Sequence, residues 1–262
     1  MDRTYTNRFE DRIEADQDLH LVFDQRASGS VLIFLSGHPE SLKIRLEAKE
    51  YSYSKIFIQN CVDSELKIEL QADVEGDAKI DLGFLDLQDT PVQLKAIGEL
   101  NRQGATMNLY TAQLCLFEKE KKANVDINSN VAHTYGNIHN FAVCFDGGKY
   151  EMVAAGRIVK GAYGSESHQE TRVLTMGKNH KCLAIPILYI DENDVKASHA
   201  LTIGQPDEDQ LYYLQSRGLN TRQAMGLLSI GYFKPVLRLI DDEALRGELE
   251  RETEARVGMY EH

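Results

Sequence analysis

The sequence predicts an all-β core followed by a small α-helical region at the C-terminal end. Between residues 19 and 203, short runs rich in β-branched and aromatic residues recur about every ten residues. Gly, Asp, Asn and Ser separate these runs, as is typical of the turns of an all-β fold. After Gly204 the apolar residues recur instead at the spacing of amphipathic helices.

The predicted strands are short, and several of them alternate apolar and polar residues. In residues 64–73, Leu66, Ile68 and Leu70 alternate with charged residues, which indicates a strand buried on one face. Residues 184–190 are continuously apolar, which is typical of a strand buried on both faces. A β-sandwich and a β-solenoid both fit, and no strict repeat decides between them. We expect strands or extended runs at residues 19–23, 30–37, 41–48, 54–60, 64–73, 77–87, 92–100, 105–117, 123–132, 139–145 and 194–203.

Two shorter regions flank this predicted core of residues 19–203. Residues 1–18 are polar and charged, and we expect an irregular or weakly helical lead-in there. Residues 204–262 form the predicted helical domain. In it, Asp207 is a candidate N-cap for a helix that ends at Arg217, because Gly218 can adopt the left-handed conformation that closes a helix.

Two further helices follow in the predicted C-terminal domain. Asn220 and Gln223 have the spacing of a capping box at the start of the second helix. Pro235 is expected to kink or divide the segment that follows. Asp241 and Asp242 can cap a last helix whose outer face is almost wholly charged, which leaves its apolar side to pack on the core or on another chain.

Composition limits the classes of partner. The chain has 29 Lys and Arg against 41 Asp and Glu, a net charge of −12, which argues against binding to nucleic acid or to an anionic membrane. No apolar run approaches the roughly 20 residues that span a bilayer. The N-terminal residues lack the apolar centre of a signal peptide, so a cytoplasmic protein is expected.

The four cysteines are too far apart in sequence to form a C-x-x-C metal or redox motif. Such widely spaced cysteines fit a reducing compartment and are most often small buried apolar residues. They are Cys61, Cys115, Cys144 and Cys182.

Familiar nucleotide-binding and hydrolase motifs are missing from the sequence. Gly147-Gly148-Lys149 is followed by Tyr150 and does not form a P-loop. Two or three histidines could meet in the folded domain and bind a metal, although dispersed histidines are commonly exposed or hydrogen-bonded. The histidines concerned are His133, His139, His168, His180 and His199.

The stretch from His199 to Gly218 resembles the SufB/SufD family of iron–sulfur cluster assembly proteins. The likeness is strong over about residues 130–235, and the chain is much shorter than full-length family members. It implies a right-handed parallel β-helix, that is a β-solenoid, with a small C-terminal helical domain. The matching residues are His199, Gln210, Leu211, Tyr212, Tyr213, Leu214, Ser216, Arg217 and Gly218.

Departures from the family pattern point to the SufD type. Thr171 stands where SufB proteins have the cysteine proposed as the cluster-building residue, and Arg172 follows in place of an acid. Threonine cannot supply the thiolate that iron–sulfur ligation needs. Ala200 replaces the acid that often follows the core histidine of SufB, and Ala197 occupies a position that is cysteine in many SufD sequences.

The resemblance also implies roles for individual residues. His199 is the candidate ligand of a transient iron–sulfur cluster at a dimer interface, with Cys182, nearby but out of register, as a second candidate. Dimerisation through the β-helix with a SufB-like protein or a second copy is implied. A SufC-type ABC ATPase is expected to bind the C-terminal helices, so this chain would be non-catalytic and bind no nucleotide. The expected ATPase contacts are Leu211, Tyr212, Arg217 and Gly218.

Two other functions remain open. A β-helix carbohydrate-active enzyme would need a pair of acid/base carboxylates, for which the candidates are Asp146, Glu151, Glu166 and Glu170. The absence of Trp argues against it, since sugar sites commonly use aromatic platforms. A structural interaction module without a metal role is the other alternative, in which His199 would be an ordinary packed residue.

Overall fold

The computed structural model describes residues 1–177 and 179–258 of the 262-residue chain. In these residues the strands build two eight-stranded sheets, one from the odd-numbered strands and one from the even-numbered strands. The first sheet contains β1 (Asp2–Tyr5), β3 (Leu19–Phe23), β5 (Ser41–Ala48), β7 (Leu66–Val74), β9 (Val92–Leu100), β11 (Glu120–Ser129), β13 (Lys149–Ile158) and β15 (Lys181–Ile190). The second contains β2 (Arg8–Ala15), β4 (Ser28–Leu35), β6 (Tyr53–Asn60), β8 (Lys79–Asp86), β10 (Thr106–Cys115), β12 (Tyr135–Cys144), β14 (Glu166–Thr175) and β16 (Lys196–Gly204).

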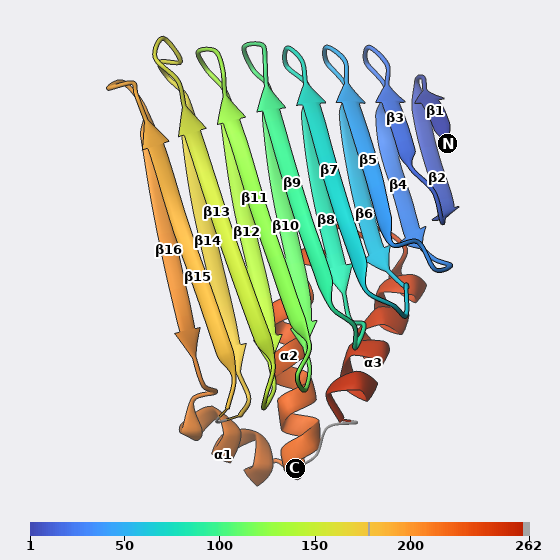
Figure 1. Cartoon of the computed structure of the whole chain (residues 1–262), viewed down its shortest axis with the longest axis vertical. Coiled ribbons are helices and arrows are strands. Elements are labelled where there is room, and N and C mark those ends of the chain that lie inside the picture. The colour runs from blue at the N-terminus through green and yellow to red at the C-terminus, as the bar shows by residue number, and fades with distance from the viewer. Residues whose placement is uncertain (178, 259–262) are drawn as a thin grey trace.

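Strand pairing identifies this arrangement as a parallel β-solenoid (Figure 1). Each strand pairs in parallel with the strands two places before and after it, except that the first and last strand of each sheet have one neighbour, so each coil gives one strand to each sheet. This pairing decides between the two predicted folds, because a sandwich is built from antiparallel strands. The predicted β-solenoid with a C-terminal helical region is therefore confirmed.

The main core lies between the two sheets. Alternate residues of each strand face inwards, and equivalent residues stack from coil to coil. The stacking keeps apolar side chains in contact along the whole solenoid, as in other repetitive folds. One such row consists of Ile56, Leu82, Leu109 and Ile138.

The helices α1 (Glu208–Ser216), α2 (Thr221–Leu237) and α3 (Glu243–Gly258) follow the last strand (Figure 1). Helices α2 and α3 cover the outer face of the even-numbered sheet and form a second apolar core with it. At the contact, Gly83 of β8 leaves room for helix α2 and the residues after it, because an added Cβ would lie 2.6 Å from Leu239 Cδ1 and 3.2 Å from Val236 Cγ1. Helix α1 buries none of its residues. None of the helices in the described ranges is long and apolar enough to cross a lipid bilayer.

The caps predicted for the helices are confirmed. The Asp207 side chain accepts a hydrogen bond from Gln210 N (3.0 Å), and Asn220 forms the capping box with Gln223. Asp242 Oδ1 accepts hydrogen bonds from two backbone N–H groups at the start of α3. Pro235 does not break α2, which continues to Leu237. The proline has no N–H to donate to the carbonyl oxygen of Gly231, and the helix ends two residues later.

The lead-in predicted for residues 1–18 is wrong in its secondary structure, because β1 and β2 form a first coil there. Their inward faces hold Tyr5 and Phe9, whose rings pack on each other and on Phe23. Asp11 also faces this end and is bound by Arg3 and by the Tyr5 hydroxyl (2.7 Å to the latter). Asp11 places a charged residue at an inward position of β2, which interrupts the alternation of apolar and polar residues by which a sequence analysis finds a strand.

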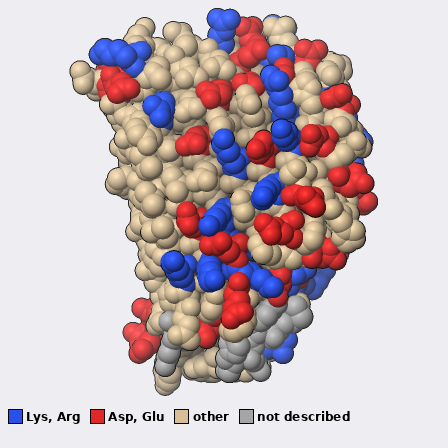
Figure 2. All heavy atoms as spheres, viewed as in Figure 1, with Lys and Arg blue, Asp and Glu red and all other residues tan. Residues whose placement is uncertain are grey.

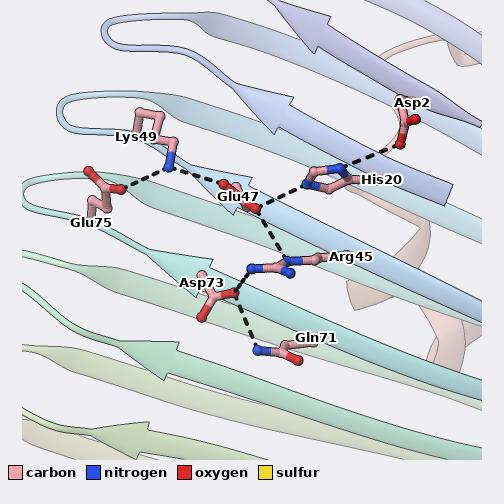
Figure 3. A network of polar contacts seen from close by, with 8 residues as sticks. All are labelled: Asp2, His20, Arg45, Glu47, Lys49, Gln71, Asp73 and Glu75. Carbon is pink, nitrogen blue, oxygen red and sulfur yellow. Dashed lines mark hydrogen bonds and ion pairs between the residues drawn. The ribbon is translucent and has the colours of Figure 1, made fainter.

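The outer face of the odd-numbered sheet carries fewer charged residues towards the C-terminal end of the solenoid (Figure 2). Near the N-terminus it carries a network of charged residues, in which Glu47 is bound by Lys49, Arg45 and His20 (Figure 3). On the last two strands of that sheet, the position of Arg45 is taken by Ala155 and Ile187. The position of Glu47 is taken by Arg157 and then by Tyr189 on the last strand. Figure 2 shows the charged residues over the earlier strands, while the left edge, where β15 and β16 lie, is mostly uncharged.

Candidate functional site at the open end of the solenoid

The two ends of the solenoid differ. In the described part of the chain, β15 and β16 are the last strands of their sheets, and each is paired along one edge only. They are ten and nine residues long, and each contains a single charged residue, a lysine at its start. β1 at the other end has four residues, two of them charged. Natural proteins commonly protect edge strands by making them short and charged, so the C-terminal edges are the ones suited to pairing with another chain.

Apolar residues are exposed at this open end. Leu201 and Ile203 of β16 belong to rows that face the core, yet 42% and 41% of their surface is accessible. In earlier coils the next strand of the sheet covers such residues. No strand of the described chain follows β16 in its sheet, so these two side chains stay accessible. Further large apolar residues exposed on β15 are Leu183, Ile185, Tyr189 and Ile190.

His199 lies on the same inward-facing side of β16. Its Cα pairs with that of Gln169, which continues the row of Leu109 and Ile138. From Val31 of β4 to Gln169 of β14 the residues of this row are buried, whereas His199 is exposed at the end of the stack. The imidazole is therefore an accessible polar group set among the apolar ends of the core rows.

The residue beneath His199 offers a further polar atom. Gln169 is almost fully buried, and its Nε2 donates a hydrogen bond to the carbonyl oxygen of Ile187 (2.8 Å). Its Oε1 has no hydrogen-bond partner among the described residues. A buried amide oxygen without a hydrogen-bond partner lowers the stability of the fold. A hydrogen-bond donor that reaches Gln169 Oε1 from the open end would remove this cost.

The described residues do not contain a complete metal site. No group of three or more His, Cys, Asp or Glu side chains is placed to hold an ion within residues 1–177 and 179–258. His199 alone cannot hold a metal ion or a cluster, since stable sites need three or four protein ligands. A metal group bound through His199 would need ligands from another molecule.

The predicted grouping of histidines is not formed. His139 stacks on Tyr110 and faces Glu170 (Nδ1–Oε2 3.4 Å), and burial is the main reason that the pKa of His139 is lowered. His168 Nδ1 lies 2.7 Å from Ser198 Oγ on the outer face. The remaining two lie elsewhere: His133 in a turn beside Tyr163, and His180 near the carbonyl oxygen of Gly177.

Cys182 is also separated from His199. Gly156 and Gln169 meet across the core, because a Cβ on Gly156 would lie 3.0 Å from Gln169 Nε2. Gly156 pairs with Leu188, so Leu188 marks the level of His199 on β15. Cys182 precedes Leu188 by six residues (188 − 182), which is about 20 Å along a strand. The two candidates cannot ligate the same small group within one protomer.

Comparison with known proteins identifies the family. The model of the SUF system FeS cluster assembly SufBD core domain matches residues 52–232. The chain belongs to the SufBD family. It is 39% identical over 102 residues to the iron–sulfur cluster assembly protein SufD of Bacillus subtilis, covering 39% of this chain and 23% of that protein. It is 34% identical over 85 residues to SufD of Escherichia coli, covering 32% and 19%.

A SufBD family protein of Mycobacterium tuberculosis is 30% identical over 129 residues, covering 48% of this chain and 15% of that protein. The matched part thus spans less than a quarter of the length of each of these relatives. The predicted membership of the SufB/SufD family and the likeness to SufD are confirmed.

The structure gives Thr171, the residue predicted to stand in place of the SufB cysteine, a role in packing. Thr171 faces the core of this SufBD protein, and its Oγ1 accepts a hydrogen bond from Asn140 Nδ2 (3.2 Å). Asn140 Oδ1 in turn accepts one from Thr111 Oγ1 (2.9 Å), so the three residues form a buried polar ladder across β10, β12 and β14. Thr171 is therefore a packed structural residue.

The carboxylates of the carbohydrate-enzyme alternative do not form a pair. Glu166 and Glu170 lie on the outer face of β14 four residues apart, about 13 Å along the strand. Glu166 binds Lys196 (2.8 Å) and Glu170 binds Arg172 (2.6 Å). Glu151 lies on the other sheet, and Asp146 accepts a hydrogen bond from Asn179 N. Glycosidase carboxylates lie within roughly 10 Å of each other across a cleft, which this arrangement does not provide.

The four predicted ATPase contacts lie on and just after helix α1. Tyr212 points away from the protein, with 74% of its surface exposed. Leu211 is half-buried in a depression that also contains Pro206 and Met225. Arg217 caps the helix and places its guanidinium over the ring of Tyr213 at 5.2 Å. Gly218 has φ +93°, which favours glycine and fixes the exit of the helix.

Proposed function

We propose that this SufBD protein is a non-catalytic scaffold subunit of a SUF-type iron–sulfur cluster assembly complex. The open end of the solenoid is the observation that carries the proposal. It combines two unpaired strand edges, exposed core residues and His199 on one surface. Family membership supplies the biochemical context, because the related proteins are named as iron–sulfur cluster assembly proteins.

Dimerisation follows from the chemistry of that end. A second chain that adds a strand to β15 and β16 would satisfy their free backbone groups, as in other cases of strand addition. It would also bury Leu201 and Ile203. The partner is a SufB-like protein or a second copy of this chain.

The cluster is the cargo of this interface. His199 supplies one nitrogen ligand, and the partner supplies the remaining ligands, which fits the incomplete ligand set found in the described residues. Cys182 lies too far from His199 to complete the same set, so any contact of Cys182 with a cluster would be at a separate position.

Helix α1 is the proposed contact for a SufC-type ATPase. A helix that is capped at both ends but buries none of its residues has an unused surface, here formed by Tyr212, Tyr213 and Arg217. Nucleotide binding and hydrolysis would belong to that partner. Motion of the ATPase would reach the solenoid through the short connection between β16 and α1.

Co-purification and light scattering test the proposal. The chain is expressed with the SufC-like ATPase and, where one exists, the SufB-like protein of the same organism. Tyr212→Ala is expected to release the ATPase, while Tyr163→Ala, an exposed tyrosine in the connection between β13 and β14, keeps it. A wild-type chain that stays a monomer and ignores both proteins contradicts the scaffold function.

The dimer interface is tested separately. Leu201→Lys places a charge on the free edge and is expected to give a folded monomer. Leu227→Lys is the matched control, because Leu227 is similarly exposed (49%) but lies on helix α2. If both variants lose the dimer, or if neither does, the open end is not the dimer interface.

A further inference from the structure

A small pocket lies on the outer face of the odd-numbered sheet. It extends from β9 across β11 and β13 to β15, and its volume is about 190 Å³. The small side chain of Ala155 leaves room in the outward-facing row that runs from Ile97 through Asp126 and Ala155 to Ile187. We call this hollow the Asp126 pocket. Its remaining walls are formed by Glu99, Asn128, Arg157 and Tyr189.

The pocket contains two carboxylates, and neither of them forms an ion pair within the described ranges. Glu99 Oε1 accepts a hydrogen bond from Asn128 Nδ2 (2.8 Å), and Glu99 Oε2 accepts one from Asn130 Nδ2 (2.8 Å). Both donors are neutral, so the negative charge of Glu99 is not compensated. Asp126 lies between apolar residues of the two neighbouring strands and has no hydrogen-bond partner among the residues that the structure describes.

The nearest basic side chains do not pair with Asp126. Arg157 stands diagonally across from it on β13, and its guanidinium lies over the ring of Tyr189, 4.5 Å from the ring centre. Lys95 is the corresponding diagonal neighbour on β9. Burial is the first cause of the raised pKa of Asp126, and the charges of Arg157 and Lys95 lower it only in part. By contrast, Glu47 on the same face of the sheet is bound directly by lysine and arginine (Figure 3).

The placement of the two carboxylates decides which kind of cation fits. Glu99 pairs with Asn128, two residues beyond Asp126, so the Cβ atoms of the two acids are roughly 8 Å apart, from a strand spacing of about 4.8 Å and a rise of about 3.3 Å per residue. The bonds from Asn128 and Asn130 hold the Glu99 carboxylate on the side away from Asp126. A single metal ion needs its oxygen ligands within about 2.6 Å, so it cannot contact both acids. An alkyl chain with an ammonium group at each end can, since five single bonds of about 1.5 Å place its nitrogen atoms roughly 6 Å apart.

We propose that the Asp126 pocket binds a small aliphatic diamine. One ammonium group donates to the Asp126 carboxylate and the other to that of Glu99, while the methylene groups between them pack on Ile97. Both ammonium groups are protonated at neutral pH, because alkylamines have a pKa near that of lysine. This binding does not depend on the proposed scaffold function, since neither carboxylate belongs to the open end or to helix α1.

Titration calorimetry with 1,4-diaminobutane tests the proposal on the purified full chain at low ionic strength, where salt screens ion pairs least. The expected result is saturable binding of one diamine per chain. Asp126→Asn and Glu99→Gln each remove one charge but keep the shape of the side chain, and each should weaken binding about tenfold. 1-Aminobutane, which has one ammonium group, should bind the wild-type chain with a similar loss. Glu120→Gln on the same strand as Asp126 is the matched control, because Glu120 already pairs with Lys122 (Oε2–Nζ 3.4 Å).

Four results would overturn the inference. The first is the absence of saturable binding, and the second is unchanged affinity in Asp126→Asn. The third is equal weakening by Glu120→Gln, which would show that the diamine only screens the net charge of −12. The fourth is equal affinity for 1-aminobutane, as expected if the pocket takes a single lysine side chain of another protein. Circular dichroism checks that each variant keeps its fold, which is expected because the substituted side chains lie on the outer face of the sheet.

Discussion

The buried ion pair between Lys121 and Asp86 allows a stability prediction to be worked out from the structure. Both side chains are fully buried, and Lys121 Nζ lies 2.7 Å from Asp86 Oδ2. Nζ also donates to the carbonyl oxygen of Gln88 (2.8 Å). Asp86 Oδ1 accepts hydrogen bonds from Asn60 Nδ2 and Gln88 N. Replacing Lys121 by Met keeps most of the volume but leaves the carboxylate with two neutral donors.

The expected cost follows from these contacts. A hydrogen bond to a charged group contributes about 1.5–3 kcal/mol, and the variant loses the ion pair with Asp86, of similar size, together with the hydrogen bond to the Gln88 carbonyl. Removing one partner of a buried pair costs about 3–5 kcal/mol in other proteins, which agrees with this sum. Lys121→Met is therefore expected to lower the free energy of unfolding by about 4 kcal/mol. Asp86→Leu alone should be similarly harmful, because it leaves the ammonium group buried.

The double variant Lys121→Met/Asp86→Leu distinguishes the ion pair from simple packing. Removing both charges together should recover about 2 kcal/mol or more relative to the sum of the two single losses. Urea denaturation followed by far-ultraviolet circular dichroism measures all four free energies. Additive single losses would refute the reasoning, as would a loss below about 1 kcal/mol for Lys121→Met.

Three further predictions concern other parts of the molecule. In the assembled complex, His199→Ala should lower the bound iron measured by absorption and metal analysis while the mass of the complex stays unchanged, and His180→Ala serves as the control; unchanged iron would remove His199 as a ligand. Gly83→Ala should cost about 1–3 kcal/mol in chemical denaturation, because the added methyl group meets Leu239 and Val236, and an unchanged midpoint would show that the helices shift freely. The hydrogen bond with Lys49 is the first cause of the lowered pKa of Glu47. This stabilisation is present above the ordinary glutamate pKa of about 4.3 and is lost as the pH falls below it, so Glu47→Gln should flatten the acid limb of a pH–stability curve, and parallel limbs would contradict this.

The strands that the sequence predicts are those with apolar residues on their inward face. β7 is an example, because Leu66, Ile68 and Leu70 all enter the core while charged residues alternate with them. β14 escapes prediction as a strand because its inward residues include Ser167, Gln169 and Thr171. Their polar groups are tolerated in the core by specific hydrogen bonds, such as that from Gln169 to the Ile187 carbonyl. The order of residues within β14 does not reveal these hydrogen bonds, because the partners lie on other strands.

The pairing of Cys115 with Cys144 illustrates a sequence spacing that is present but hard to use for prediction. Cys115 and Cys144 are 29 residues apart, which equals the offset between β10 and β12. The offset is 27 residues between β8 and β10 (106 − 79) and 31 between β12 and β14 (166 − 135), because the turns differ in length. A sequence analysis therefore finds no fixed period and cannot align the cysteines.

The position of His199 is explained by where the stack of coils stops. The same inward-facing row is filled by Leu109 and Ile138 in earlier coils, where a histidine would have to be buried. At the N-terminal end, the rings of Tyr5 and Phe9 and the ion pair of Arg3 with Asp11 close the core in the first coil. The C-terminal end has no such closure among the described residues, so its rows end in accessible side chains on two long, nearly uncharged edges. A partner chain that continues both sheets, as proposed, would pair these strand edges, whereas a small ligand would leave them unpaired. The accessibility of His199 and the unpaired edges to which the proposed partner would add therefore have one physical origin.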